Sequence, residues 1–268
     1  MAPLTDRTAL IHHRARARAM DDAWFLHDAA AAEVGERLRD VNRSFTDPAL
    51  VTGFPDRATT VLPGATVVPD DDVLALGVGA HDLVVHFMAL HWADDPVGQL
   101  VQCRRALRPD GLLLACCLGG DTLAELRAAL GQAEVEVAGG LSPRVAPMGE
   151  VRDLGALLQR AGLALPVADV TDQTVRYRDL FHLICDLRAM GETNALAARH
   201  RGTVPRDLFA RAARLYDDAY ADGDGVRATF QTVFLTGWAP SETQPKALRP
   251  GSATTRLADA LGTQERRG

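Results

Sequence analysis

The sequence predicts an α/β fold built on an open, mostly parallel sheet. Two segments have the composition of buried parallel strands: HDLVVHFMALHW at 81–92, where an acid precedes a continuous apolar run, and LLLACCL at 112–118. One helical pattern separates the two runs and another follows the second run. This alternation is typical of parallel βα units, and such sheets bind their ligands at the carboxyl ends of the strands.

The overall composition is that of an ordinary soluble globular protein. The 268 residues are 47% apolar and 24% charged, and the net charge is −6. This balance gives no basis for binding nucleic acid or an anionic membrane surface. The sequence shows neither the apolar core of a secretory signal nor a stretch apolar enough to span a membrane, so a cytoplasmic location is predicted.

The four cysteines are interpreted as structural thiols. Cys103, Cys116, Cys117 and Cys185 have no metal-ligand spacing, and two of them lie inside an apolar run. No metal site is therefore predicted.

An N-terminal helical segment, residues 1–45, is predicted to precede the main domain, residues 46–268. Its amphipathic helix is expected over 20–43, with Asp21 or Asp22 as the N-cap. The basic run RARARAM is interpreted as the start of this same helix.

The main domain is predicted to continue with alternating strands and helices. A helical lid is expected at about 178–222, after the fifth strand. The other predicted strands are 49–54, 65–76, 166–177 and 225–240. The predicted helices are 96–111, 122–139, 151–162, 205–221 and a short one in the C-terminal tail, and 179–200 is predicted as one helix or as a pair interrupted near Gly191.

Several motifs resemble those of class I S-adenosylmethionine (SAM)-dependent methyltransferases. The generic part consists of DLVV at 82–85, LHW at 90–92 and RALRPDG at 105–111. Four longer segments resemble one bacterial and mitochondrial branch more narrowly: 119–130, 141–162, 186–196 and 233–253. That branch is the methyltransferase-like assembly factor of respiratory complex I, associated with arginine hydroxylation and related to the BioC malonyl-carrier-protein methyltransferases. The resemblance covers about residues 14–262 and implies a Rossmann-like class I methyltransferase fold with SAM as its cofactor.

The predicted cofactor loop is shortened relative to that family. The family's first strand usually ends in a D-x-G-x-x-x-G loop, and in VTGFPD at 51–56 only Gly53 fits this pattern. Phe54 adds bulk and Pro55 removes a backbone donor. The residues between Gly53 and Val67 are too few for a full helix, a second strand and a second helix. The sequence therefore predicts that the ribose-binding acid of the second strand has been deleted.

The resemblance implies further cofactor residues beside Gly53. Asp70, with Asp71 adjacent, matches the acid that contacts the adenine amino group, although a solvated acidic turn explains the same residues equally well. Leu90 falls in the loop after the next strand. In that loop His91 is the candidate catalytic residue and Trp92 a candidate for substrate contact, while packing of both side chains is the alternative.

Four more residues are candidates for contact with a substrate or partner. Arg144 and Tyr177 would select an anionic or peptide substrate, and ordinary salt bridging is the alternative. Glu192 and Asn194 follow a helix glycine in MGETNAL, where a simple turn does not require them.

Three functions are compatible with these features. The first is a SAM-dependent methyltransferase-family enzyme that acts on a protein substrate in complex I assembly, by methyl transfer or arginine hydroxylation. The second is a non-catalytic assembly protein on a decayed methyltransferase fold, which the shortened loop favours. The third is a carrier-protein methyltransferase of the BioC type. The predicted partner is a protein, such as a complex I subunit, which the chain would approach from the membrane periphery.

Overall fold

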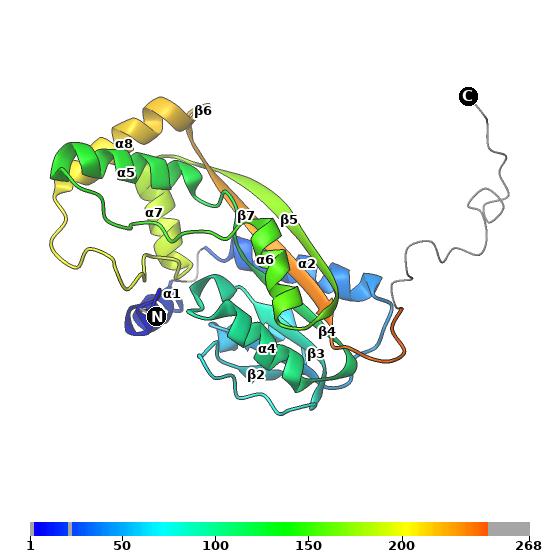
Figure 1. Ribbon diagram of the computed structural model, residues 1–268. Helices are drawn as coiled ribbons and strands as arrows, with labels where there is room; N and C mark the ends of the chain where they lie inside the picture. Colours follow the sequence, from blue (N-terminus) through cyan, green and yellow to red (C-terminus); the bar gives the residue numbers. More distant parts are fainter. Residues whose placement is uncertain (1–2, 21–22, 246–268) are drawn as a thin grey trace, which may run out of the picture.

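The computed structural model describes residues 3–20 and 23–245 (Figure 1). Within these residues seven strands form one sheet of order β2-β1-β3-β4-β7-β5, and β6 pairs with β7. The strands are β1 (Pro48–Thr52), β2 (Thr66–Val68), β3 (His81–Phe87), β4 (Leu107–Leu118), β5 (Ala164–Tyr177), β6 (Ala221–Asp222) and β7 (Gly225–Trp238).

The first four strands are parallel, which confirms the predicted α/β class. Strand β7 runs antiparallel to both β4 and β5. The chain leaves β1 toward β2 on one side and then crosses to β3 on the other side. The strand order therefore reverses at β1, and a ligand crevice is expected between the carboxyl ends of β1 and β3.

Helices cover both faces of this sheet. They are α1 (Arg7–Ala17), α2 (Phe25–Asp40), α3 (Ala58–Val61), α4 (Pro96–Ala106), α5 (Ala124–Ala138), α6 (Val151–Arg160), α7 (Leu180–Ala189) and α8 (Arg206–Tyr220), with 3-10 turns η1 (Pro55–Arg57) and η2 (Leu90–Trp92). Aspartates cap three of the helices: Asp6, Asp95 and Asp179 each accept a hydrogen bond from a backbone N–H in the first turn. None of the helices in the described residues combines the length and the apolar character needed to cross a bilayer.

Alternation along the strands divides the core into two layers. Leu83 and Val85 of β3 pack toward α2, whereas Val84 packs with residues of α4 and α6. A third cluster joins α5, α7 and α8 over the far ends of β5 and β7. Each fully buried Val or Leu side chain stabilises the folded state by roughly 1.5–3 kcal/mol. These clusters therefore hold the helices on the sheet.

The N-terminal region differs from the prediction of one helix over 20–43. Residues 14–17 of the basic run belong to a separate helix, α1, and α2 begins only at Phe25, with Trp24 in the capping position. The reason is that α1 buries Leu10, Arg14 and Ala17 at the sheet edge, while α2 packs against the sheet itself. Asp21 and Asp22 lie outside the described residues, as does the helix predicted in the tail.

The first βα unit is as short as the residue count predicts. Only η1 and the four-residue helix α3 separate β1 from β2. Strand β2 then pairs directly with β1, with Ala49 opposite Thr66 and Val51 opposite Val68. No further strand lies between β1 and β2, and Asp70 follows two residues after the end of β2.

Candidate functional site

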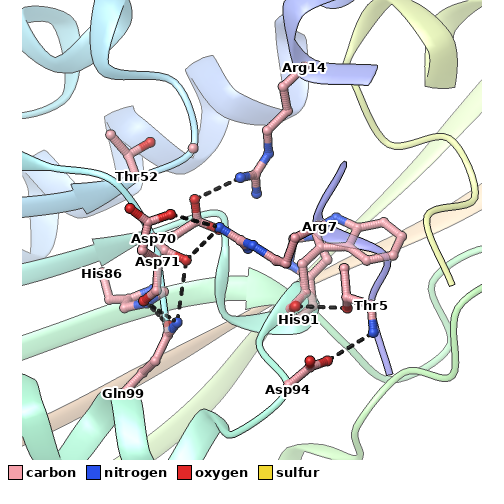
Figure 2. Close-up of polar contacts among 12 residues, drawn as sticks. Thr5, Arg7, Arg14, Thr52, Asp70, Asp71, His86, His91, Asp94 and Gln99 are labelled. Atoms are coloured by element: carbon pink, nitrogen blue, oxygen red, sulfur yellow. Dashed lines mark hydrogen bonds and ion pairs between the residues drawn. The ribbon is translucent and has the colours of Figure 1, made fainter. Parts of the chain in front are cut away.

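The candidate site lies at the reversal of strand order. Gly53 and Phe54 follow β1, and the loop beginning at Met88 follows β3. The Thr52 hydroxyl accepts a hydrogen bond from the Phe54 N–H at 3.1 Å and so tightens the first loop. Figure 2 shows that side chains from α1 reach into this edge from outside the sheet.

Asp70 is the anionic centre of this edge. It is only 2% exposed, and its carboxylate accepts from Arg14 Nη1 at 2.7 Å and from Arg7 Nη1 at 3.2 Å (Figure 2). Burial alone would raise the pKa of Asp70, but the charges and hydrogen bonds of Arg14 and Arg7 outweigh it and lower the pKa. Asp70 is therefore a buried, ionised carboxylate that is already paired.

Gly53 lies directly against the guanidinium of Arg14. A Cβ placed on Gly53 would overlap with Arg14 Cζ, so another residue fits there only if the arginine moves. The Gly53 carbonyl also accepts from Arg18 Nη2 at 3.3 Å. The glycine allows a close approach, and what approaches it is the chain's own side chain.

The residues at this edge, as they lie, do not fit SAM. Arg14 fills the space against the loop where the resemblance puts the cofactor, and Asp70 has no acceptor oxygen free of an arginine. Phe54 closes the loop from the other side and packs edge-to-face on Trp24, with ring centroids 4.8 Å apart. SAM binding would therefore require α1 to move.

The two other predicted cofactor residues have different surroundings. Asp71 points outward, with 61% of its side chain exposed, and lies 3.4 Å from Arg7 Nη2. Leu90 is 2% exposed and belongs to the hydrophobic core. The three aspartates at 70–72 form an acidic loop after β2. Gln99 of α4 holds this acidic loop by donating hydrogen bonds to the carbonyls of Asp70 and Asp71 at 3.4 and 3.1 Å.

The predicted catalytic histidine belongs to a buried polar cluster. His91 Nε2 lies 3.1 Å from Glu192 Oε2, and the indole N–H of Trp92 donates to the same oxygen at 2.8 Å. Burial would raise the pKa of Glu192, but the charge and hydrogen bond of His91 lower it. These three predicted residues therefore meet although about a hundred positions of sequence separate Glu192 from the other two.

His27 of α2 is a further buried histidine near this edge. Neither of its ring nitrogens has a hydrogen-bond partner among the described residues, and its ring packs edge-to-face on Phe54. Burial lowers the pKa of His27 to about 4, so the ring is neutral at physiological pH.

A cavity of about 240 Å³ adjoins Glu192. Its wall is mostly apolar and includes leucines from β4, α5 and α7. Four of the five predicted substrate or partner residues lie at its wall: Trp92, Arg144, Glu192 and Asn194. They come from three separate loops. Helix α7 and Phe209 of α8, both from the segment predicted as a lid, complete the wall.

The polar residues of the cavity are held by the protein. Arg144 pairs with the buried Glu134 at 2.7 Å, and Asn194 donates to the carbonyl of Pro143 at 2.9 Å. The two loops around residues 144 and 194 are therefore tied together. The fifth predicted residue, Tyr177, is not part of this wall; it is 2% exposed in the core under α7 and α8.

Sequence reasoning missed Arg7, Arg14 and His27. The spacing of seven residues between the two arginines, which puts both on one face of a helix, is the signal that could have found them. The basic run by itself indicates only the start of a helix. No group of His, Cys, Asp or Glu in the described part of the chain is arranged to hold a metal ion.

Residues 54–115 match the methyltransferase domain family. The arginine-hydroxylase NDUFAF5 of Danio rerio is 36% identical over 220 residues, which are 82% of this chain and 68% of that protein. The human arginine-hydroxylase NDUFAF5 is 38% identical over 201 residues, covering 75% of this chain and 58% of that protein. The malonyl-[acyl-carrier protein] O-methyltransferase of Laribacter hongkongensis is 36% identical over 187 residues, covering 70% and 61%. The chain thus spans less than two thirds of the length of several of these relatives.

Among solved structures, the YcgJ protein from Bacillus subtilis superposes with a TM-score of 0.51 at 11% identity. The match covers 78% of this chain and 98% of that one. At such low identity this likeness concerns the fold alone.

Proposed function

Because this chain belongs to the class I methyltransferase-like family that includes the arginine-hydroxylase NDUFAF5, we propose that it acts on a protein substrate in the assembly of respiratory complex I. The substrate segment enters the cavity beside Glu192. The chain has no nucleic-acid partner in this proposal, and it meets the complex I subunit from the membrane periphery.

One observation carries this proposal. Trp92, Arg144, Glu192 and Asn194 converge on one cavity, although they come from distant parts of the sequence. A solvated face or a set of unrelated salt bridges would not bring them to the same wall. A cavity with mostly apolar walls and a few fixed polar groups is the usual form of a ligand site.

The cavity chemistry suits a side chain with an apolar stem and a polar end. The leucines and Ile184 would pack on the stem, and the buried Glu192 carboxylate lies at the wall beside Trp92. Both hydrogen bonds to Glu192 described above reach Oε2. The second carboxylate oxygen, Oε1, is the group we propose for contact with the substrate.

The proposal is tested by blocking the cavity from α7. Ile184→Trp fills the wall, and Phe181→Trp is the matched control because Phe181 lies on the same helix, is 49% exposed and is not part of the wall. Each full-length variant replaces the chromosomal copy in the source cell, and NADH–quinone oxidoreductase activity is measured in isolated membranes. A photo-crosslinking residue at position 184 then identifies the bound protein.

We expect Phe181→Trp to support wild-type activity and Ile184→Trp to lower it at least tenfold at equal protein levels. We expect the crosslinked protein to be a complex I subunit. Full activity with Ile184→Trp, or crosslinks confined to acyl-carrier protein, would overturn the proposal; the second result would favour the carrier-protein methyltransferases among the relatives.

A second candidate function is SAM-dependent transfer to the same protein substrate. The observation that favours it is the position of Asp70, two residues after β2, where the resemblance puts the adenine contact. Asp70 would be free for this contact only after α1 has moved. Calorimetric titration with SAM tests this candidate. Micromolar affinity would support it, and no heat at millimolar SAM would leave the cofactor-independent assembly role.

A further inference from the structure

The edge beside Asp70 is occupied by the chain itself, in a manner separate from the substrate cavity. Figure 2 shows Arg7 and Arg14 of α1 both aimed at the acidic loop. Arg14 Nη1 donates a hydrogen bond to one carboxylate oxygen of Asp70. Arg7 donates to the other carboxylate oxygen and, at 2.9 Å, to the backbone carbonyl of Asp70. Two guanidinium groups therefore satisfy the carboxylate that a nucleoside-type ligand would use.

The fit of Arg14 extends beyond this ion pair. Its guanidinium lies on Gly53, in space that any side chain at position 53 would fill. Arg14 Cζ also lies 5.7 Å from the centroid of the Phe54 ring, within the range of a cation–π contact. A carboxylate, a bare glycine face and an aromatic ring together make a receptor for a planar cation.

Polar contacts hold the rest of the N-terminal segment on the same edge. The N–H groups of Leu4 and Thr5 donate to Asp94 at 2.9 and 2.8 Å, and Thr5 Oγ1 donates to the Trp92 carbonyl at 2.8 Å. Arg18 pairs with Asp56 at 3.0 Å. The segment therefore spans both loops of the crevice, after β1 and after β3.

The docking of α1 also leaves hydrogen-bonding groups unused. Arg14 is 5% exposed, yet its Nε and Nη2 have no partner among the described residues. These two nitrogens form one edge of the guanidinium and remain buried donors, which opposes docking. Only Leu10 and Ala17 accompany Arg14 as buried residues of α1. The helix is thus held by two buried apolar residues together with polar contacts, and the polar groups of Arg14 are incompletely satisfied.

We infer that the edge at Gly53 and Asp70 is a guanidinium-binding site whose resident ligand is Arg14, and that a nucleoside-type cofactor reaches it only by displacing α1. This inference goes beyond the proposed function, because it does not involve the substrate cavity. It gives the glycine at position 53 a role in this chain, because the absence of a side chain there accommodates Arg14.

The first experiment asks whether the site recognises a guanidinium group. Arg14→Ala vacates it in the protein, and Arg16→Ala is the control, because Arg16 is exposed on the same helix and pairs with no acid of the described residues. Thermal unfolding is followed with ethylguanidinium or ethylammonium at equal ionic strength. We expect ethylguanidinium to raise the unfolding temperature of Arg14→Ala more than ethylammonium does, and to have no such effect on Arg16→Ala.

The same rescue should disappear when Asp70→Asn is combined with Arg14→Ala. Equal responses to the two cations, or rescue that persists without the Asp70 carboxylate, would overturn the guanidinium site. If Arg14→Ala is too unstable to purify, Arg14→Gln replaces it, since glutamine keeps a polar side chain without the planar cation.

The second experiment asks whether Arg14 competes with a cofactor. Wild type, Arg14→Ala and Arg16→Ala are titrated with SAM by calorimetry. We expect Arg14→Ala to bind SAM at least tenfold more tightly than the wild type, and Arg16→Ala to match the wild type. Weaker binding by Arg14→Ala would mean that Arg14 holds the cofactor, and absence of binding by all three would mean that the edge is no cofactor site; either result overturns the competition. These SAM titrations do not change the results expected for Ile184→Trp and Phe181→Trp, so the further inference and the proposed function can fail separately.

Discussion

At the scale of single residues, Asp70 shows how partners decide the role of a carboxylate. A solvated acidic turn and a cofactor contact both fitted its sequence, but the folded chain buries it between two arginines. Breaking a buried pair by removing one partner leaves the other charge uncompensated, which costs roughly 3–5 kcal/mol. The carboxylate therefore supports the fold as well as the site.

We expect Asp70→Asn to lower the free energy of unfolding by about 3 kcal/mol at neutral pH. Because the pKa of Asp70 is lowered in the folded state, its contribution is fully present above the ordinary value of 3.8 and is lost as the pH falls through the folded pKa. The gap between wild type and variant should therefore stay constant from neutral pH down to roughly pH 5 and close below that. Urea unfolding at a series of pH values measures it.

Asp71→Asn is the matched control for this measurement. Its side chain is 61% exposed and its contact with Arg7 is long, so a change of at most about 0.5 kcal/mol is expected at every pH. If both variants lost equal stability, or if the Asp70→Asn gap widened in acid, the assignment of Asp70 as a buried, paired carboxylate would be wrong.

At the scale of elements, α2 is anchored to the sheet by one arginine. Arg37 donates to both oxygens of Asp169 on β5, at 2.7 and 2.6 Å, and its guanidinium lies 4.2 Å from the ring centroid of Phe234 on β7. The ion pair is half-exposed, so it is worth no more than about 1 kcal/mol, and the stacking adds roughly 0.5–1 kcal/mol.

We expect Arg37→Ala to destabilise the protein by about 1–2 kcal/mol. Arg39→Ala serves as the control because the Arg39 side chain is 72% exposed and its nearest acid is 4.0 Å away. It should change stability by less than about 0.5 kcal/mol. Urea denaturation of both variants gives the comparison, and equal losses would contradict the anchoring role of Arg37.

At the scale of the whole molecule, the reactivity of the thiols indicates how readily the core opens to solvent. Cys103, Cys116 and Cys117 are buried and Cys185 is exposed, and all four are free. Burial raises the pKa of Cys103 and of Cys117 to about 12, which suppresses the reactive thiolate. Three of the four thiols should therefore react only after the sheet opens.

We expect Ellman's reagent to modify one thiol in the native protein and four in concentrated urea. Cys185→Ser should remove the fast native reaction and leave the slow ones unchanged. Rapid modification of two or more thiols in the native Cys185→Ser variant would show that the layers around β4 and α4 open far more readily than their packing indicates.

The sequence by itself determined the fold class, the family and the short connection between β1 and β2. Apolar runs, helical periodicity and the short span between Gly53 and Val67 are properties of neighbouring residues, so they can be recognised without coordinates. The same holds for the motifs around His91 and Glu192, which carried the resemblance.

Only the tertiary structure decided what fills the site. The pairing of Arg14 with Asp70 joins positions 56 residues apart, and the meeting of Trp92 with Glu192 joins positions 100 apart. Such contacts depend on how α1, β3 and the loop after α7 pack, and the sequence pattern of each element is silent on its partner. The helix expected over 20–43 is therefore the shorter helix α2, and residues 14–17 of its predicted basic start belong to a separate helix, α1, at the edge beside Asp70.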